Sequence, residues 1–293
     1  MNYLSLSEKL KNQFGCKVYK VALQASDSCP NRDGTVGRGG CIFCLDGSGA
    51  FCEKNEGSVY EQIERAKSKV AKKNAGGKYI AYFQSYTNTY GDVSRLERIF
   101  TEAANHPDIV AVSIATRPDC LGDEVMAMLV RVGKIKPLWV ELGLQTSNER
   151  SAEYIRRGYD NGVYERAVKK LREIGCEVIT HIILCLPGES VFDMKESVKY
   201  AVRNGTDGIK LSLLHVLAGT DLEKDYKDAK FTLPDLDEYC GIVIECLKEV
   251  PPHVTVHRLT GDGDKRHLIA PMWTANKKLV MDTLNKRIKD CTE

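Results

Sequence analysis

The chain has 293 residues, of which 43% are hydrophobic and 28% are charged, and this composition excludes disordered and fibrous proteins. It carries 42 Lys and Arg against 40 Asp and Glu, so the net charge of +2 excludes the strongly basic character of a protein that coats nucleic acid. The 11 cysteines are more than an ordinary chain of this length carries and fewer than a disulfide scaffold needs.

The N-terminal segment indicates where the protein works and what its cysteines do. Residues 1–13 are polar, with Glu8, Lys9 and Lys11, and lack the apolar stretch of a secretory signal. The apolar run 179–186 contains His181 and is much shorter than the roughly 18 residues of a membrane span. We therefore expect a cytoplasmic protein with no membrane partner. Its thiols should be ligands, nucleophiles or buried small side chains rather than disulfides.

Short segments rich in Val, Ile and Leu alternate along the chain with charged segments of helical period. Six strands are predicted, at 18–23, 78–84, 109–115, 137–145, 177–184 and 208–214. Helices are predicted at 59–75, 93–105, 123–132, 163–174 and 190–203, with a short turn or helix near 148–157. This alternation indicates an α/β fold with a parallel sheet and helices on its outer face.

Six strands are two short of a closed eight-stranded barrel. The alternatives are a partial (β/α)6 TIM-like barrel and a doubly wound sheet, and both bind ligands at the carboxyl ends of their strands. After residue 219 the pattern changes to a polar stretch at 221–230, a helix at 234–250, a strand at 254–259 and a terminal helix at 275–288. We predict an N-terminal lead-in at 1–17, a core at 18–219 and a small C-terminal α/β extension at 220–293.

Three cysteines follow the first predicted strand with the spacing C-x11-C-x2-C: Cys29, Cys41 and Cys44. Six glycines fall among residues 34–49, so this loop can fold tightly and return the first thiol to the other two. Three thiolates can hold an iron–sulfur cluster and leave one iron open to another ligand. The alternatives are a redox pair and a zinc site with Cys52 as the fourth ligand.

The glycine-rich loop with its three cysteines, the βα alternation and the segment CPNRDG…GRGGCIFC resemble radical S-adenosylmethionine (SAM) enzymes, in particular their YhcC/YtqA-like branch, which is related to the elongator-type enzymes. The resemblance implies a partial barrel and a [4Fe–4S] cluster whose open iron binds SAM. It also implies reductive cleavage of SAM to a 5′-deoxyadenosyl radical that abstracts hydrogen from the substrate. The electron would come from a donor of the flavodoxin or ferredoxin type.

The resemblance also implies SAM contacts at the strand ends. The candidates are Gln84, Ser85, Asn88, Arg117, Glu141, Gln145, Arg157, Pro187 and Gly188. A polar turn that caps the next helix explains residues 84–88 equally well. Glu141 lies in an apolar run and needs a partner, which is SAM, Arg117 or Arg157. Arg157 is preferred to its neighbour Arg156 for the SAM carboxylate, with a solvated charged face as the alternative.

Four more residues are candidates for catalysis or substrate binding. They are His181, His215, Arg258 and Asp262. Core packing is the alternative for the two histidines, and a polar turn is the alternative for the segment 255–264, which the resemblance places over the barrel mouth.

The substrate is less well defined than the chemistry. Because relatives of this branch resemble tRNA-modifying enzymes, the leading substrate is a modified wobble uridine, with tRNA as the partner. Residues 65–78 include six basic and no acidic side chains, which indicates either a phosphate-binding face or a solvated helix. The alternatives are a radical SAM enzyme acting on a small metabolite or peptide, and a zinc-bearing binding protein without turnover.

Overall fold

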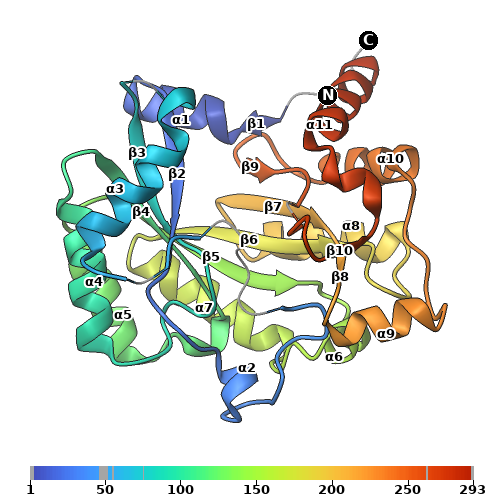
Figure 1. The fold of residues 1–293 in the computed structure, drawn as a ribbon, viewed down its shortest axis with the longest axis horizontal. Helices are drawn as coiled ribbons and strands as arrows, with labels where there is room; N and C mark the ends of the chain where they lie inside the picture. The colour runs from blue at the N-terminus through green and yellow to red at the C-terminus, as the bar shows by residue number, and fades with distance from the viewer. Residues whose placement is uncertain (1–2, 46–51, 55, 75, 262, 292–293) are drawn as a thin grey trace.

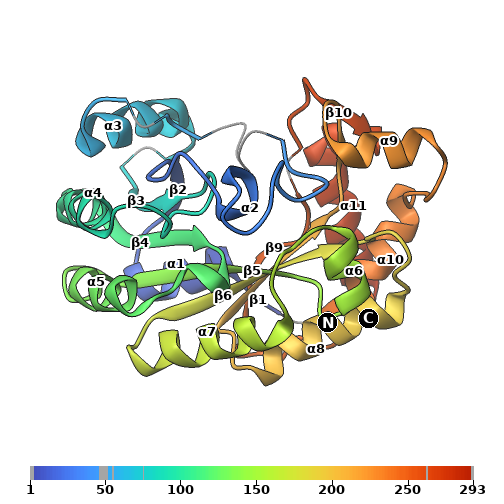
Figure 2. The ribbon, with the colours of Figure 1, turned by 90° about the horizontal axis from the view of Figure 1, so that it is seen from below.

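A computed structural model describes residues 3–45, 52–54, 56–74, 76–261 and 263–291 of the protein. Its centre is an eight-stranded sheet in the order β1-β9-β7-β6-β5-β4-β3-β2, with every neighbouring pair parallel. These strands are β1 (Leu4–Ser5), β2 (Val18–Leu23), β3 (Lys78–Phe83), β4 (Ile109–Thr116), β5 (Leu138–Gln145), β6 (Glu177–Leu184), β7 (Gly208–Leu213) and β9 (Thr255–Arg258). The sheet curls into a partial barrel, with β1 and β2 as its two edge strands (Figures 1 and 2).

Helices that follow the strands cover the outer face of the sheet (Figure 2). They are α3 (Val59–Val70), α4 (Val93–Asn105), α5 (Asp123–Gly133), α7 (Asn161–Glu173) and α8 (Val191–Arg203). The helix starts are defined by side chains: in α3 and α8, the serine before the helix and the acid three residues later cap each other's backbone N–H groups.

The remaining helices and strands lie outside the βα repeat. The helices are α1 (Leu6–Phe14), α2 (Pro30–Asp33), α6 (Glu149–Tyr154), α9 (Asp221–Lys227), α10 (Leu236–Leu247) and α11 (Lys277–Asp290), with 3-10 turns at Ala71–Lys73, Pro118–Cys120 and Met272–Ala275. Strands β8 (Val216–Leu217) and β10 (Leu268–Ala270) form a separate antiparallel pair. Helix α1 packs near β1, β2 and β9, α9 packs on β8, and α10 packs on α8 and α11.

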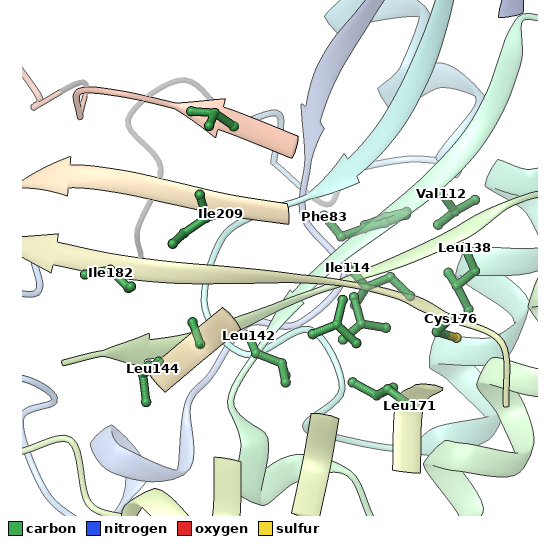
Figure 3. Close-up of a cluster of buried hydrophobic side chains, with 14 of the residues drawn as sticks. Phe83, Val112, Ile114, Leu138, Leu142, Leu144, Leu171, Cys176, Ile182 and Ile209 are labelled. Atoms are coloured by element: carbon green, nitrogen blue, oxygen red, sulfur yellow. The ribbon is translucent and has the colours of Figure 1, made fainter. Parts of the chain in front are cut away.

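Alternate residues of each strand point outward and build the main hydrophobic core against the helices (Figure 3). Ile114, Leu142 and Ile182 from three strands are almost fully buried there, together with Leu171 of α7. Full burial of such a side chain contributes about 1.5–3 kcal/mol to folding. Cys176 lies in the same core, so this thiol acts as a small apolar side chain.

The inner face of the sheet has two different levels. Near the amino ends of the strands, Ile80, Trp139 and Ile179 pack with Leu10 of α1, and this apolar cluster closes the floor of the barrel. The level above it is polar. We call this level the polar layer; it consists of Lys20, Tyr82, Ser113, Glu141, His181 and Lys210.

The predicted α/β class and partial barrel are confirmed, and strands 18–23 and 177–184 have the predicted bounds. The predicted number of strands was too low, because β1 and β9 extend the sheet on the far side of β7. The strand expected in the C-terminal extension is β9, which pairs with the core strand β7. The polar stretch 221–230 contains a helix, α9. Among the described residues, no helix has the length and apolar character needed to cross a membrane.

Candidate active site

The three clustered cysteines are positioned by α2 and by the turns that follow it. Cys29 directly precedes α2, and its carbonyl accepts hydrogen bonds from the backbone N–H groups of Arg32 and Asp33. The chain then returns through Gly40, at φ +84°, to a turn in which the Cys44 N–H donates to the Cys41 carbonyl over 2.9 Å. Helix α2 and these turns therefore place the three thiol-bearing segments around the same cavity.

Two residues of α2 form hydrogen bonds that hold the cysteine loop in place. The Asn31 side-chain amide donates to the Arg156 carbonyl at 2.6 Å and contacts Cys41 Sγ at 3.4 Å. The Arg32 guanidinium donates to the carbonyls of Cys44 at 2.9 Å and Leu45 at 2.7 Å. Arg32 therefore holds the backbone after Cys44, whereas Asn31 holds the backbone and also donates to the sulfur of Cys41.

The chemistry of this thiol set fits an iron–sulfur cluster. Burial, together with the neighbouring thiols of Cys44 and Cys29, raises the pKa of Cys41 to about 11. A thiolate at this position therefore needs positive charge beside it, which iron supplies.

The three cysteines line a cavity of about 950 Å³ that reaches down to the polar layer. The predicted site residues that line this same cavity are Gln84, Ser85, Arg117, Glu141, Gln145, Arg157, His181, His215 and Arg258. Asn88, Pro187 and Gly188 are not among its lining residues, and Asp262 lies outside the described residues. The strand ends thus gather most of the predicted residues around one space.

Glu141 is the centre of the polar layer and is 1% exposed. Its carboxylate accepts hydrogen bonds from Lys20 at 2.6 Å, Ser113 at 2.7 Å and Lys210, and it is bonded to His181 Nε2 at 2.7 Å. Burial raises the pKa of Glu141, but Lys20, Lys210 and His181 outweigh that effect and hold it well below its ordinary value. The carboxylate is therefore ionised.

Of the predicted partners of Glu141, SAM stays a prediction, and the alternative of a bridge to Arg117 or Arg157 was wrong. The cationic partners of Glu141 are Lys20 of β2 and Lys210 of β7, neither of which is among the predicted site residues. The sequence marks each lysine as unusual, because it interrupts an apolar strand as Glu141 does, but it does not show that the lysines meet Glu141.

Arg117 lies beside the cysteines. Its guanidinium forms a bidentate pair with Asp119 at 2.9 and 2.7 Å and lies over the Tyr159 ring, 4.8 Å from the centroid. Its positive charge acts against the raised pKa of the Cys41 thiol. Arg117 also donates to the Arg157 carbonyl at 2.9 Å, so Asp119 and this carbonyl take three of its five N–H groups.

Arg157 is 1% exposed and is engaged with the backbone. It donates to the carbonyls of Leu144, Thr146 and Tyr159 at 2.7–3.0 Å and to Glu149 at 3.2 Å. These contacts occupy four of its five N–H groups, so most of its capacity fixes the end of β5.

Asn88 is fully buried and also has a structural position. Its side-chain carbonyl accepts hydrogen bonds from the N–H groups of Ala25 and Ser26, and its amide donates to the carbonyls of Phe83 and Ala115. The helix cap expected near residues 84–88 comes instead from Asp92.

Three strand ends carry a non-glycine residue in the left-handed region, which the sequence did not reveal. They are Tyr86 after β3, at φ 60°, Gln145 at the end of β5, at φ 67°, and Cys185 after β6, at φ 66°. Such backbone costs energy and is concentrated at functional sites. Tyr86 and Gln145 both line the cavity, so the sharp turns occur where the site lies.

The basic run 65–78 is largely balanced by acids from elsewhere in the fold. Lys67 pairs with Glu64 at 2.6 Å and with Asp108 at 2.7 Å, and Lys78 also pairs with Asp108, at 3.0 Å. Glu53 pairs with Lys69 and with Arg65. This arrangement favours the solvated helix over a phosphate-binding face.

The cysteines outside the loop are all free thiols. Cys176, Cys240 and Cys246 are buried, Cys16, Cys52, Cys120 and Cys185 are partly buried, and Cys291 is exposed.

Residues 28–201 match the family model of the radical SAM superfamily, and residues 206–290 match the Radical_SAM C-terminal domain. The chain is 43% identical over 289 residues to the protein YtqA of Bacillus subtilis (strain 168), covering 98% of this chain and 90% of YtqA. It is 27% identical over 197 residues to a tRNA uridine(34) acetyltransferase of Dehalococcoides mccartyi, covering 66% of this chain and 42% of that protein. The fold is similar to that of the archaeal Elp3 of Methanocaldococcus infernus, with a TM-score of 0.68 and 18% identity over 92% of this chain and 63% of Elp3.

The chain belongs to the radical SAM superfamily, in the branch related to Elp3. It is an enzyme whose cofactors are a [4Fe–4S] cluster and SAM. The alternative of a zinc-bearing binding protein without turnover does not agree with this membership.

Proposed function

We propose that the enzyme abstracts a hydrogen atom from the side chain of a modified wobble uridine of tRNA. The supporting observation is the similarity to a tRNA uridine(34) acetyltransferase, which extends over 66% of this chain. The cavity adds a physical argument, because its volume of about 950 Å³ is at the upper end of the range for small-molecule sites and leaves room beyond one ligand.

We assign different roles to the residues in different parts of the cavity. Cys29, Cys41 and Cys44 would hold the cluster. When bound, the cluster and SAM supply the one-electron cleavage and the hydrogen abstraction. Arg117, beside the cysteines, would bind the carboxylate of SAM, and Gln84 would bind its amino group. The polar layer and the apolar cluster beneath it close the other end of the cavity and keep water from the reacting groups.

The first test is on the purified chain. Anaerobic reconstitution with iron and sulfide should give a protein that releases 5′-deoxyadenosine from SAM when dithionite supplies electrons. A flavodoxin or ferredoxin type donor is predicted to replace dithionite. A reconstituted protein that leaves SAM intact would contradict the proposed chemistry.

The second test concerns the substrate. Mass spectrometry of tRNA nucleosides from a deletion strain should show loss of one modified uridine and accumulation of its precursor, with restoration by the intact gene. An unchanged nucleoside profile would refute the tRNA substrate and favour a small metabolite or peptide.

A further inference from the structure

The polar layer holds more positive than negative charge. Lys20 and Lys210 share the single carboxylate of Glu141, each bonded to a different oxygen. Lys210 is 4% exposed and Glu141 is 1% exposed, so little water reaches the pair. Among the six described residues of this layer, two lysines therefore face one acid.

His181 does not change this balance. Burial and the nearby charge of Lys210 lower the pKa of His181 to about 4, so the imidazole is neutral at pH 7. Protonated lysines would give the six residues of the layer a net charge of 2 − 1 = +1, and the positive charge of Arg258 also acts on both lysines. A buried charge without a partner is costly, and burial lowers the pKa of Lys210 well below its ordinary value. An incoming anion would remove that cost.

The cavity gives a ligand access to the layer. Tyr82, Glu141 and His181 line it, and Arg258 of β9 lines it nearby. Glu141 lies four residues before the end of β5, so the layer is on the order of 10 Å below the strand ends. The cysteines lie in the loop after β2, at the opposite end of the same cavity.

We propose that the polar layer is a binding site for a carboxylate of the substrate. A carboxylate would offset the positive charge of the two lysines, which exceeds the charge of Glu141, and its two oxygens can accept hydrogen bonds from the donors that face the cavity. Tyr82 and Arg258 provide donor groups at the cavity surface, and the two lysines provide the charge beneath them. This inference rests on the proposed function, since it describes the end of the substrate that enters the barrel.

Calorimetric titration of the full chain with sodium acetate and with acetamide, at constant ionic strength, tests the site. The two probes have nearly the same shape and differ in charge, so acetate should bind and acetamide should bind at least about tenfold more weakly. Equal binding of the two would overturn the proposal. Inorganic phosphate that binds more tightly than acetate would also overturn it, because the site would then select a different anion.

Variants that change the net charge of the layer sharpen the test. Lys210→Met leaves Glu141 paired with Lys20 and brings the net charge to zero, so acetate affinity should fall roughly tenfold or more. Glu141→Gln raises the net charge to +2 and should strengthen acetate binding. Lys195→Met removes a lysine on α8 that pairs with Glu245 and Glu249, and should leave the affinity unchanged.

The results separate this inference from the proposed function. Wild-type acetate affinity in Lys210→Met would overturn the inference, and if that variant does not fold, the acetamide comparison and Glu141→Gln still decide it. Release of 5′-deoxyadenosine from SAM is measured without acetate. A chain that cleaves SAM but does not prefer acetate refutes only the carboxylate site, and one that prefers acetate but leaves SAM intact refutes only the proposed chemistry.

Discussion

The side chain of Asn88 fixes the backbone of Ala25, because Asn88 Oδ1 accepts the Ala25 N–H at 3.1 Å in a fully buried position. The same side chain bonds the carbonyls of Phe83 and Ala115. Asn88 therefore connects the start of the cysteine loop with the ends of β3 and β4. A residue that the sequence offers as a ligand contact instead holds together the frame on which the ligand site is built.

Asn88→Ala should lower the free energy of unfolding by about 3 kcal/mol, because it leaves several buried backbone groups without a partner. Urea unfolding of the apoprotein followed by circular dichroism measures this. Asn105→Ala removes an exposed amide that donates to Thr101 of its own helix, α4, and should cost under about 0.5 kcal/mol. Similar losses in the two variants would contradict the structural role of Asn88.

Cys29→Ala should abolish cluster binding while the chain remains folded, because Cys29 contributes its backbone carbonyl, rather than its side chain, to the start of α2. Iron content and the visible absorbance after anaerobic reconstitution measure the loss, and 5′-deoxyadenosine release should fall with them. Cys291→Ser changes an exposed thiol and should keep wild-type iron. Full iron content in Cys29→Ala would rule out this ligand.

Gly40→Ala should reduce cluster loading. Residue 40 has a positive φ, and a Cβ there would lie 3.0 Å from Arg32 Nε, so the substitution strains the turn and displaces the Arg32 anchor. We expect a loss of about 1–2 kcal/mol in stability together with lower iron content. Gly122→Ala is the matched control, because its φ of −67° is ordinary and its Cβ would meet no atom within 4 Å. Equal iron content in both variants would contradict this reasoning.

His181 should make the protein less stable in acid. Its pKa lies at about 4 in the fold against an ordinary 6.5, so between these pH values the unfolded chain binds more protons and stability falls as the pH drops. The side chain keeps 28% exposure, which reduces the effect to about 1–2 kcal/mol.

His181→Gln, which keeps a donor for Glu141, should flatten the loss of stability between pH 6.5 and 4 in urea titrations. His253→Gln alters an exposed histidine and should follow the wild type. An unchanged slope in His181→Gln would show that other groups cause the acid sensitivity.

Hydrophobic periodicity was sufficient to predict the core strands, because alternation and turn residues are local properties. The strand 254–259 was predicted, but its place beside β7 was not, since the order of strands in a sheet depends on contacts between distant segments. The two-residue strand β1 and the four-residue helix α2 are too short for a periodic signal.

The parts of the site that could be predicted are those recognised by the spacing of residues along the sequence. The three cysteines could be found because their spacing and glycines are local. The partners of Glu141 could not, because alternation places Lys20 and Lys210 on the inner face without telling which side chains meet across the barrel. For Arg157, the motif identified a residue near the cavity. It could not show that backbone carbonyls already accept hydrogen bonds from its guanidinium.

Three of the residues that line the cavity have small side chains. Ala115, Gly143 and Ser212 line the cavity, and a Cβ at position 143 would already meet Gln145 Nε2 at 2.7 Å. Enlarging any of these side chains reduces the space for a substrate and leaves every cluster ligand and every polar-layer side chain in place. Larger side chains at these three positions would therefore change the room for a substrate without changing the residues that would hold the cluster.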